Sequence, residues 1–377
     1  MAPSWRSRPI SLWLPNELIT EIIEALTRSD RAALCRVSKL LHGLGVPVLY
    51  RVVKVTKLPQ IETFCSAVLS NPMLTGLVQS FTVSAAGSHS FEEIIQYIAV
   101  SGTFPVQTSS SLSDLLRDPV RALSRLQYLS LDHEMMFKEQ FDALLGCTFP
   151  SLASCDTWNQ RTPIDTFAFF LARHSAMTYL RIHLGAKFES PFVIPLPSLQ
   201  HFEGPVELIP WISTRRLRHA RIDWGFFPKA HNIEASIVAL GSLTCSDIPV
   251  VISSSWCGGN FLKIIDSVSR YIPHTKALIT PASNLNDEQI VHVGNCLLRF
   301  TSLEFLSVES SSFLSMGRTE CADYRTAAQN IGNLCPTLTA YLVGNEAWNN
   351  ASGTWETFPS KEFRELCERS FGKFPDF

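Results

Sequence analysis

The sequence predicts an α/β protein in which three short N-terminal helices precede an irregular solenoid with a parallel sheet on its concave face. Residues 12–51 carry apolar side chains at helical spacing between polar turns. From residue 126 to residue 343 the pattern Leu-x-x-Leu-x-Leu recurs, as expected of short strands in a repeat array. Segments with helical periodicity separate its copies, and such alternation of strands and helices favours a parallel sheet.

The composition is that of a folded chain without a strongly charged partner. Of the 377 residues, 46% are hydrophobic and 18% are charged, which excludes a disordered chain. The net charge of -2 gives no reason to expect nucleic acid, because phosphates attract a clustered basic face. No apolar run approaches the ~18 residues of a membrane span and no secretory signal is recognisable. We therefore expect no membrane partner and a cytoplasmic or nuclear location.

The ten cysteines and the known catalytic motifs indicate neither a metal site nor a catalytic site. No two cysteines form a Cys-x-x-Cys pair, so we predict free thiols. The chain lacks a Gly-x-Ser-x-Gly elbow, a Walker loop and a His-Glu-x-x-His motif. Cys257 precedes two glycines near the start of a predicted helix, where a thiolate would be favoured, but the sequence assigns no base to it. We predict a protein that is not an enzyme and has no cofactor.

Residues 12–51 predict the three short helices, after a flexible leader at residues 1–11. Pro15 suits the first position of a helix, and the apolar residues between Leu18 and Leu26 share one face of it. Ser29 or Asp30 can cap a second helix that runs to residue 41, and a break at residues 42–45 precedes a last turn. A unit of this size cannot bury so much apolar surface internally, so it needs a partner.

The segments that carry these helices are LPNELITEII, LCRVSKLLHGL and PVLYR, and together they resemble an F-box. The resemblance implies that residues 12–51 bind the Skp adaptor, and through it a cullin, in a Skp–cullin–F-box ubiquitin ligase. The implied adaptor-binding residues are Leu14, Pro15, Leu18, Ile19, Ile22, Ile23, Leu34, Val37, Leu49 and Tyr50. The sequence does not divide them between the adaptor contact and the interior of the unit.

Residues 52–377 are predicted as one recognition domain. Strands are expected at residues 52–56 and 77–84, helices at 60–70 and 91–100, and a surface loop at 101–118. Further strands start where the pattern recurs, near residues 126, 152, 177, 199, 217, 275, 303 and 338. Helices are expected at residues 137–145, 164–174, 232–240, 261–271, 287–299 and 324–334, and a last helix at 361–371 is expected to cap the open end. The sequence leaves the number of repeats between residues 225 and 275 open.

The recurring unit is the strand half of a leucine-rich repeat. With the N-terminal segment, it makes the chain resemble F-box proteins with a divergent leucine-rich-repeat-like domain, of the kind common in fungi. The residues between the leucines would point away from the core on the concave face. The predicted substrate-binding residues on this face are Tyr128, Tyr179, Arg181, His183, His201, Glu203, His219, Arg221 and Phe305.

Two interpretations of the charged residues on this face stay open. Arg181, Glu203 and Arg221 are expected side by side, at the ~5 Å spacing of adjacent strands. They could compensate each other's charge across the strands, or the two arginines could grip an acidic or phosphorylated epitope. The histidines lack a carboxylate or cysteine at ligand spacing, so we predict no metal.

The function predicted from the resemblance is that of a substrate-recognition subunit of the ligase, with the Skp adaptor on the F-box and a protein substrate on the repeats. One alternative is a ligand sensor whose concave face holds a small molecule. Another is an adaptor-bound scaffold outside any ligase, and a third is an enzyme with an unrecognised site. The substrate itself is not indicated by the sequence.

Overall fold

The computed structural model divides the chain into two compact units, Met1–Thr157 and Trp158–Phe377, and each is described by itself. The structure describes residues 14–56, 58–84, 123–132, 145–159, 164–184, 192–224, 233–254, 260–282, 286–310, 331–344, 346–350 and 353–371. The predicted helix at 91–100, the loop at 101–118, nearly all of the helix at 137–145 and the first seven residues of the helix at 324–334 lie outside these residues, and residues 331–334 are helical as predicted. None of the described helices is long and apolar enough to cross a membrane.

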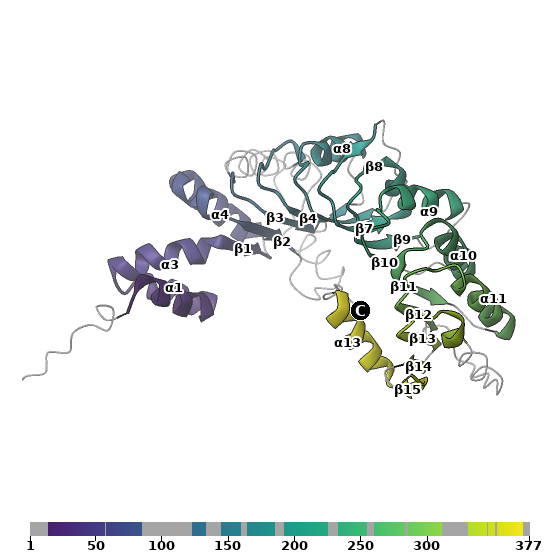
Figure 1. The fold of residues 1–377 in the computed structure, drawn as a ribbon. Helices are drawn as coiled ribbons and strands as arrows, with labels where there is room; N and C mark the ends of the chain where they lie inside the picture. The colour runs from purple at the N-terminus through teal and green to yellow at the C-terminus, as the bar shows by residue number, and fades with distance from the viewer. Residues whose placement is uncertain are drawn as a thin grey trace, which may run out of the picture. The chain divides into compact units, whose positions relative to one another are not determined.

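The first unit begins with three helices, α1 (Asn16–Ala25), α2 (Arg28–Leu34) and α3 (Lys39–Arg51) (Figure 1). The Thr27 side chain accepts a hydrogen bond from the Asp30 backbone and so caps α2, and Ser38 caps α3 in the same way. The predicted second helix is therefore two helices, because Ser38 starts a new one. The predicted break at residues 42–45 is absent, since α3 continues through it to Arg51.

The sheet of the first unit follows these helices. The strands β1 (Val52–Val55), β2 (Ser80–Val83) and β3 (Tyr128–Asp132) pair in parallel, and β4 (Ser154–Asn159) follows β3 in the strand order. Between β1 and β2 lie α4 (Leu58–Ser70) and the short 3-10 helix η2 (Pro72–Leu77). Alternate strand residues are buried, and the ring of Phe81 stacks on Phe64 of α4 at 5.4 Å.

The second unit is built on a longer and mostly parallel sheet. Its parallel strands, in spatial order, are β5 (Tyr179–Leu184), β7 (His201–Pro205), β9 (His219–Asp223), β10 (Val250–Ser254), β11 (Thr275–Ala282), β12 (Phe305–Ser310) and β13 (Ala340–Gly344). The antiparallel strands β14 (Glu346–Asn349) and β15 (Glu356–Phe358) extend it. Gly344 adopts a left-handed φ of 65°, which the turn from β13 into β14 requires and glycine tolerates. Two short strands, β6 (Ile194–Pro195) and β8 (Ile212–Ser213), pair separately.

Helices cover one side of this sheet. They are α8 (Ile164–Ala172), the 3-10 helix η4 (Val206–Trp211), α9 (Ile233–Ser242), α10 (Phe261–Tyr271) and α11 (Asp287–Leu297). The leucines of the recurring pattern point towards them: Leu180, Leu306 and the residue that opens each copy, such as Leu199, are fully buried. This α/β arrangement, with one strand and one connecting segment per repeat, is consistent with a solenoid-like repeat. We call the opposite side of the sheet the inner face.

The last helix, α13 (Ser360–Phe371), packs against the inner face instead of capping the open end (Figure 1). The end of the strand order is formed by β14 and β15, which the sequence did not predict. Trp348 of β14 is fully buried and stacks on Tyr341 of β13 at 4.9 Å, and Trp355 contacts the same ring at 4.8 Å. These aromatic contacts explain why the C-terminal segment folds back onto β13.

Candidate functional site

The N-terminal helices expose four large apolar side chains. Leu18 and Ile22 lie one turn apart on α1, and their exposed fractions are 43% and 50%. Val37, between α2 and α3, is 70% exposed, and Leu40 in the first turn of α3 is 39% exposed. Exposure of large apolar side chains to water is unfavourable, so these four residues suit a contact with a protein partner.

The remaining residues of the predicted adaptor site lie inside the unit or beside it. Ile19 and Ile23 form a core with Val48, and Leu14 and Leu34 pack against that core. Their side chains hold the exposed residues in place, because they fix α1 against α3. Pro15, just before α1, is exposed.

Leu49 and Tyr50 are half-buried and line a pocket of about 350 Å³. The pocket lies among α2, α3, β1 and α4, and Val53 and Phe64 form part of its wall. These two predicted residues thus face the sheet side of the unit.

The inner face of the second unit carries a continuous row of residues on seven parallel strands. The strand register places side by side Tyr179, His201, His219, Val251, Ala277, Phe305 and Ala340. The rings of His201 and His219 stack at 4.5 Å with an interplanar angle of 12°, and Tyr179 lies 6.2 Å from His201. Four residues of the predicted face thus lie in one row, although Val251 and Ala277 separate Phe305 from the histidines. Tyr128 is half-buried on β3 of the first unit.

A second row on the same strands is charged. Nε of Arg181 and Nη1 of Arg221 each lie 3.4 Å from Oε1 of Glu203, whose side chain is 9% exposed. Nε of Arg181 also donates a hydrogen bond to Nε2 of His183 at 3.0 Å. The buried carboxylate is shared by both arginines, which favours the interpretation as charge compensation across strands over a preformed grip for an acidic epitope.

The histidines of the first row are uncharged near neutral pH. Burial, the neighbouring His201 and the charge of Arg218 together lower the pKa of His219 to about 4. Burial and Arg218 also lower the pKa of His201. The open part of the row is therefore a surface of neutral rings beside an ion-pair network, suited to packing against apolar or polar groups.

The other part of the row is covered by α13. Phe363 and Cys367 are buried against Val251, Ala277, Phe305, Ala340 and Leu342. Phe371 meets Phe305 edge to face at 5.2 Å, and Nζ of Lys276 lies 5.9 Å from the centre of the Phe371 ring. Phe305 lies on the predicted face, but it is only 5% exposed because α13 covers it. In this conformation its ring cannot contact a substrate.

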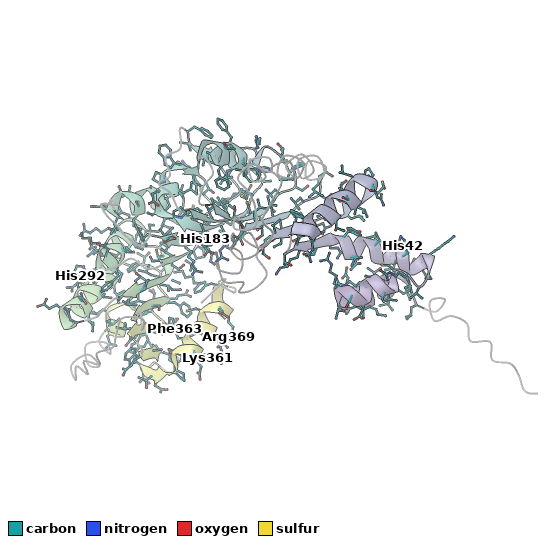
Figure 2. All side chains as sticks on the ribbon, turned by 180° about the vertical axis from the view of Figure 1, so that it is seen from behind. His42, His183, His292, Lys361, Phe363 and Arg369 are labelled. Carbon is teal, nitrogen blue, oxygen red and sulfur yellow. The ribbon has the colours of Figure 1, made fainter. Side chains whose placement is uncertain are left out.

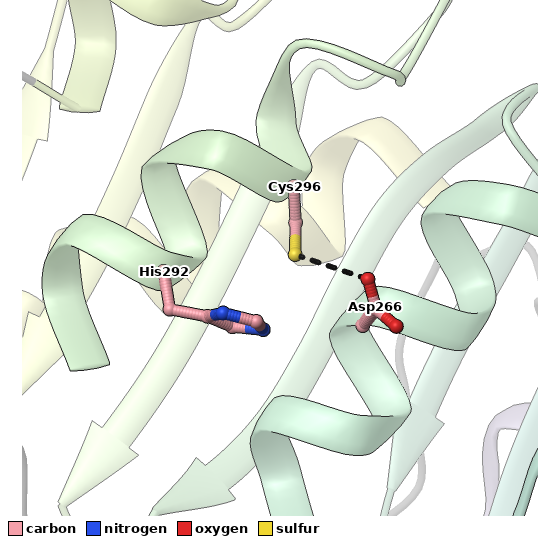
Figure 3. Close-up of side chains that lie close together, drawn as sticks. All are labelled: Asp266, His292 and Cys296. Carbon is pink, nitrogen blue, oxygen red and sulfur yellow. Dashed lines mark hydrogen bonds between the residues drawn. The ribbon is translucent and has the colours of Figure 1, made fainter. Parts of the chain in front are cut away.

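A cluster that the sequence did not predict lies between α10 and α11 (Figure 3). One ligand atom from each of Asp266, His292 and Cys296 lies within 4.8 Å of the others. Arg299 and Arg270 donate to the two carboxylate oxygens of Asp266 at 2.9 and 2.7 Å. Partial burial disfavours the Asp266 charge, but the arginines outweigh it and lower the pKa, while burial raises the pKa of the Cys296 thiol. With the carboxylate occupied and the thiol protonated, the cluster fits an ion-pair network that joins two helices.

Two solved structures have folds distantly similar to this one. No family model matches the chain, and no curated protein matches it. The structure is similar to the crystal structure of the Rad7 and Elc1 complex in yeast, with a TM-score of 0.41 and 13% identity over 88% of this chain and 89% of that chain. It is also similar to the TLR13–ssRNA13 complex, with a TM-score of 0.26 and 14% identity over 60% of this chain and 40% of that chain.

Proposed function

We propose that this protein is the substrate-recognition subunit of a Skp–cullin–F-box ubiquitin ligase, acting in the cytoplasm or nucleus. The observation that carries the proposal is the group of exposed apolar residues Leu18, Ile22, Val37 and Leu40 on the three N-terminal helices, whose sequence resembles an F-box. The Skp adaptor would cover these side chains. A protein substrate would bind the open part of the inner face, around Tyr179, His201 and His219.

The energetics fit an interface of this kind. Full burial of a large aliphatic side chain contributes about 1.5–3 kcal/mol, so covering four that are roughly half exposed contributes about 3–6 kcal/mol in total. Polar contacts at the rim of the interface must add to this contribution, because association itself costs several kcal/mol. Ile22 is the best single anchor. It lies in the second half of α1, and the buried side chains of Ile19 and Ile23 hold this helix in place.

In this proposal the chain supplies no reacting group. It raises the rate of ubiquitin transfer by holding a substrate lysine near a loaded conjugating enzyme, which converts an encounter in solution into a reaction within one complex. The neutral rings and the shared carboxylate of Glu203 suit contacts with a folded protein surface. Specificity would then come from shape and hydrogen bonding more than from net charge.

The first test is co-expression of the full chain with a Skp adaptor, followed by size-exclusion chromatography. We expect stoichiometric co-elution of the wild type and its loss in Ile22→Glu, because a charge at this position cannot be buried in the interface. Leu69→Glu is the matched control, since Leu69 is exposed on α4 of the same unit and lies outside the proposed surface. Equal co-elution of both variants, with circular dichroism spectra like that of the wild type, would refute the assignment.

A second step separates the ligase from a scaffold that binds only the adaptor. The complex is mixed with a cullin and its ring-finger partner, and co-elution of all components supports the ligase. An adaptor complex that never retains the cullin would support the scaffold instead. Either result leaves the assignment of Ile22 to the adaptor surface unchanged.

A further inference from the structure

Part of the inner face of the second unit is apolar and is covered by a helix, and we call this covered surface the groove. Its floor consists of Val251, Ala277, Phe305, Ala340, Leu342 and Ala347. From α13, Phe363 and Cys367 are buried in it, and Leu366 and Phe371 pack at its margins. Residues 363, 367 and 371 follow each other at intervals of one helical turn, so they form a single stripe along α13.

The floor of the groove differs from the rest of the same row in a way that suits a helix. Where the row is open, it carries the large polar rings of His201 and His219. Where α13 lies, the neighbouring positions are Ala277 and Ala340, and small side chains let a helix approach a sheet closely. Phe305, between the two alanines, supplies the ring that Phe371 meets edge to face.

The other side of α13 is charged. Lys361, Glu362 and Arg369 are exposed, while Phe363 faces the sheet (Figure 2). Lys361 pairs with Glu365 one turn along the same helix, at 3.9 Å. The helix is therefore amphipathic, and only Pro359 separates it from β15, so it is tethered at its first turn.

We propose that this groove is a binding site for an amphipathic helix of a partner protein, and that α13 is its resident occupant, which the partner helix replaces. The partner helix presents large apolar residues at positions i, i+4 and i+8 and charged residues on its other face, as helices bound in grooves do. The proposal is independent of adaptor binding, because it concerns only residues of the second unit.

The tether sets the conditions for exchange. A helix attached to its own groove has an effective concentration on the order of millimolar, so a free helix competes only at similar concentration or with tighter binding. A partner that already contacts the neighbouring rings of His201 and His219 meets this condition, since its helix is held close by. A helix of a partner bound nearby would then replace α13 in the groove, whereas free helices in the cell would not.

Cys367 is a native reporter of this exchange, because its thiol is buried beneath α13. The full-length protein is treated with a maleimide under native conditions, and the modified cysteines are mapped by mass spectrometry. Cys335 is the internal control: it is equally buried but does not belong to the groove. The probe is a synthetic peptide of residues 358–371 with Ser in place of Cys367, and the control peptide carries Phe363→Asp in addition.

At millimolar peptide we expect labelling of Cys367 to accelerate at least about tenfold, with no change at Cys335, because local opening exposes only residues beneath the helix that moves. The control peptide should have no effect. Phe371→Ala should label faster at Cys367 even without peptide, whereas Lys361→Ala should behave as the wild type.

Two results would overturn the proposal. Labelling of Cys367 that is the same with both peptides would show that α13 does not exchange. An equal acceleration at Cys335 would show that the peptide unfolds the sheet instead of replacing the helix. Both are read from the wild-type protein, so they stand even if Phe371→Ala does not fold.

Discussion

Replacing His219 by Gln should remove part of the pH dependence of stability of the second unit. In the folded protein the pKa of this imidazole is lowered from 6.5 to about 4 by burial, by His201 and by Arg218. The unfolded chain therefore takes up a proton near pH 6.5 that the folded chain takes up only near pH 4. The contribution to stability is complete above pH 6.5 and is lost as the pH falls through that range.

The size of the effect follows from the same values. One pKa unit corresponds to about 1.4 kcal/mol, so the fall of the pKa from 6.5 to about 4 sets an upper limit of about 3.5 kcal/mol. The ring is only partly buried, and screening by solvent reduces the expected loss to about 2 kcal/mol. His201, His174 and His274 also have lowered pKa values and add to the loss in the wild type, so the variant is needed to isolate His219.

The assay is urea unfolding between pH 4.5 and pH 7.5, followed by tryptophan fluorescence, because most of the tryptophans lie in the second unit. At pH 7.5 we expect His219→Gln to be less stable than the wild type by about 1 kcal/mol, because it loses the stacked ring. By pH 4.5 this difference should vanish or reverse. Parallel pH profiles for the two proteins would refute the reasoning, since they would mean that His219 titrates alike in both states.

Three further substitutions test the packing by the same urea assay. Glu203→Gln removes the carboxylate that two arginines share and should lower the free energy of unfolding by about 1–2 kcal/mol; a loss under about 0.5 kcal/mol would contradict the shared ion pair. Gly332→Ala places a methyl group in steric conflict with the Trp355 ring and should destabilise by about 1–3 kcal/mol with a shift in tryptophan emission; unchanged emission would contradict the contact. Asn286→Ala breaks the capping box of α11 and should cost about 1 kcal/mol, which Asn286→Ser largely restores; equal losses would contradict the cap.

Much of the repeat architecture could be predicted from the sequence. The leucines that open each copy of the pattern are buried, and the residues between them form rows in parallel register, so that Arg181, Glu203 and Arg221 are neighbours as expected. The reason is that a period of two within strands fixes which side chains share a face. The strand β10 was missed because Val250–Ser254 carries valine and isoleucine in place of the leucines that mark the pattern.

Other features depend on contacts that no local pattern encodes. The sequence of α13 shows an apolar stripe but does not say which surface covers it, so its place against Phe305 could not be predicted. The apolar face of α1 is too wide to be divided by periodicity alone: Ile19 and Ile23 turned out to be buried, and Leu18 and Ile22 exposed. The cluster at Asp266 joins residues about thirty positions apart, although the four-residue spacing of His292 and Cys296 was visible.

The hairpin of β14 and β15 has a consequence for the solubility of fragments. A parallel array that stopped at β13 would leave Ala340–Gly344 with unpaired backbone groups and buried apolar side chains along an open edge, which another chain could extend. In the intact protein the last strand is β15, which has three residues and exposes Glu356 and Thr357. So short and polar an edge is a poor template for polymerisation. A fragment that ends at Gly344 should therefore form aggregates, whereas one that retains β15 and α13 should remain dispersed.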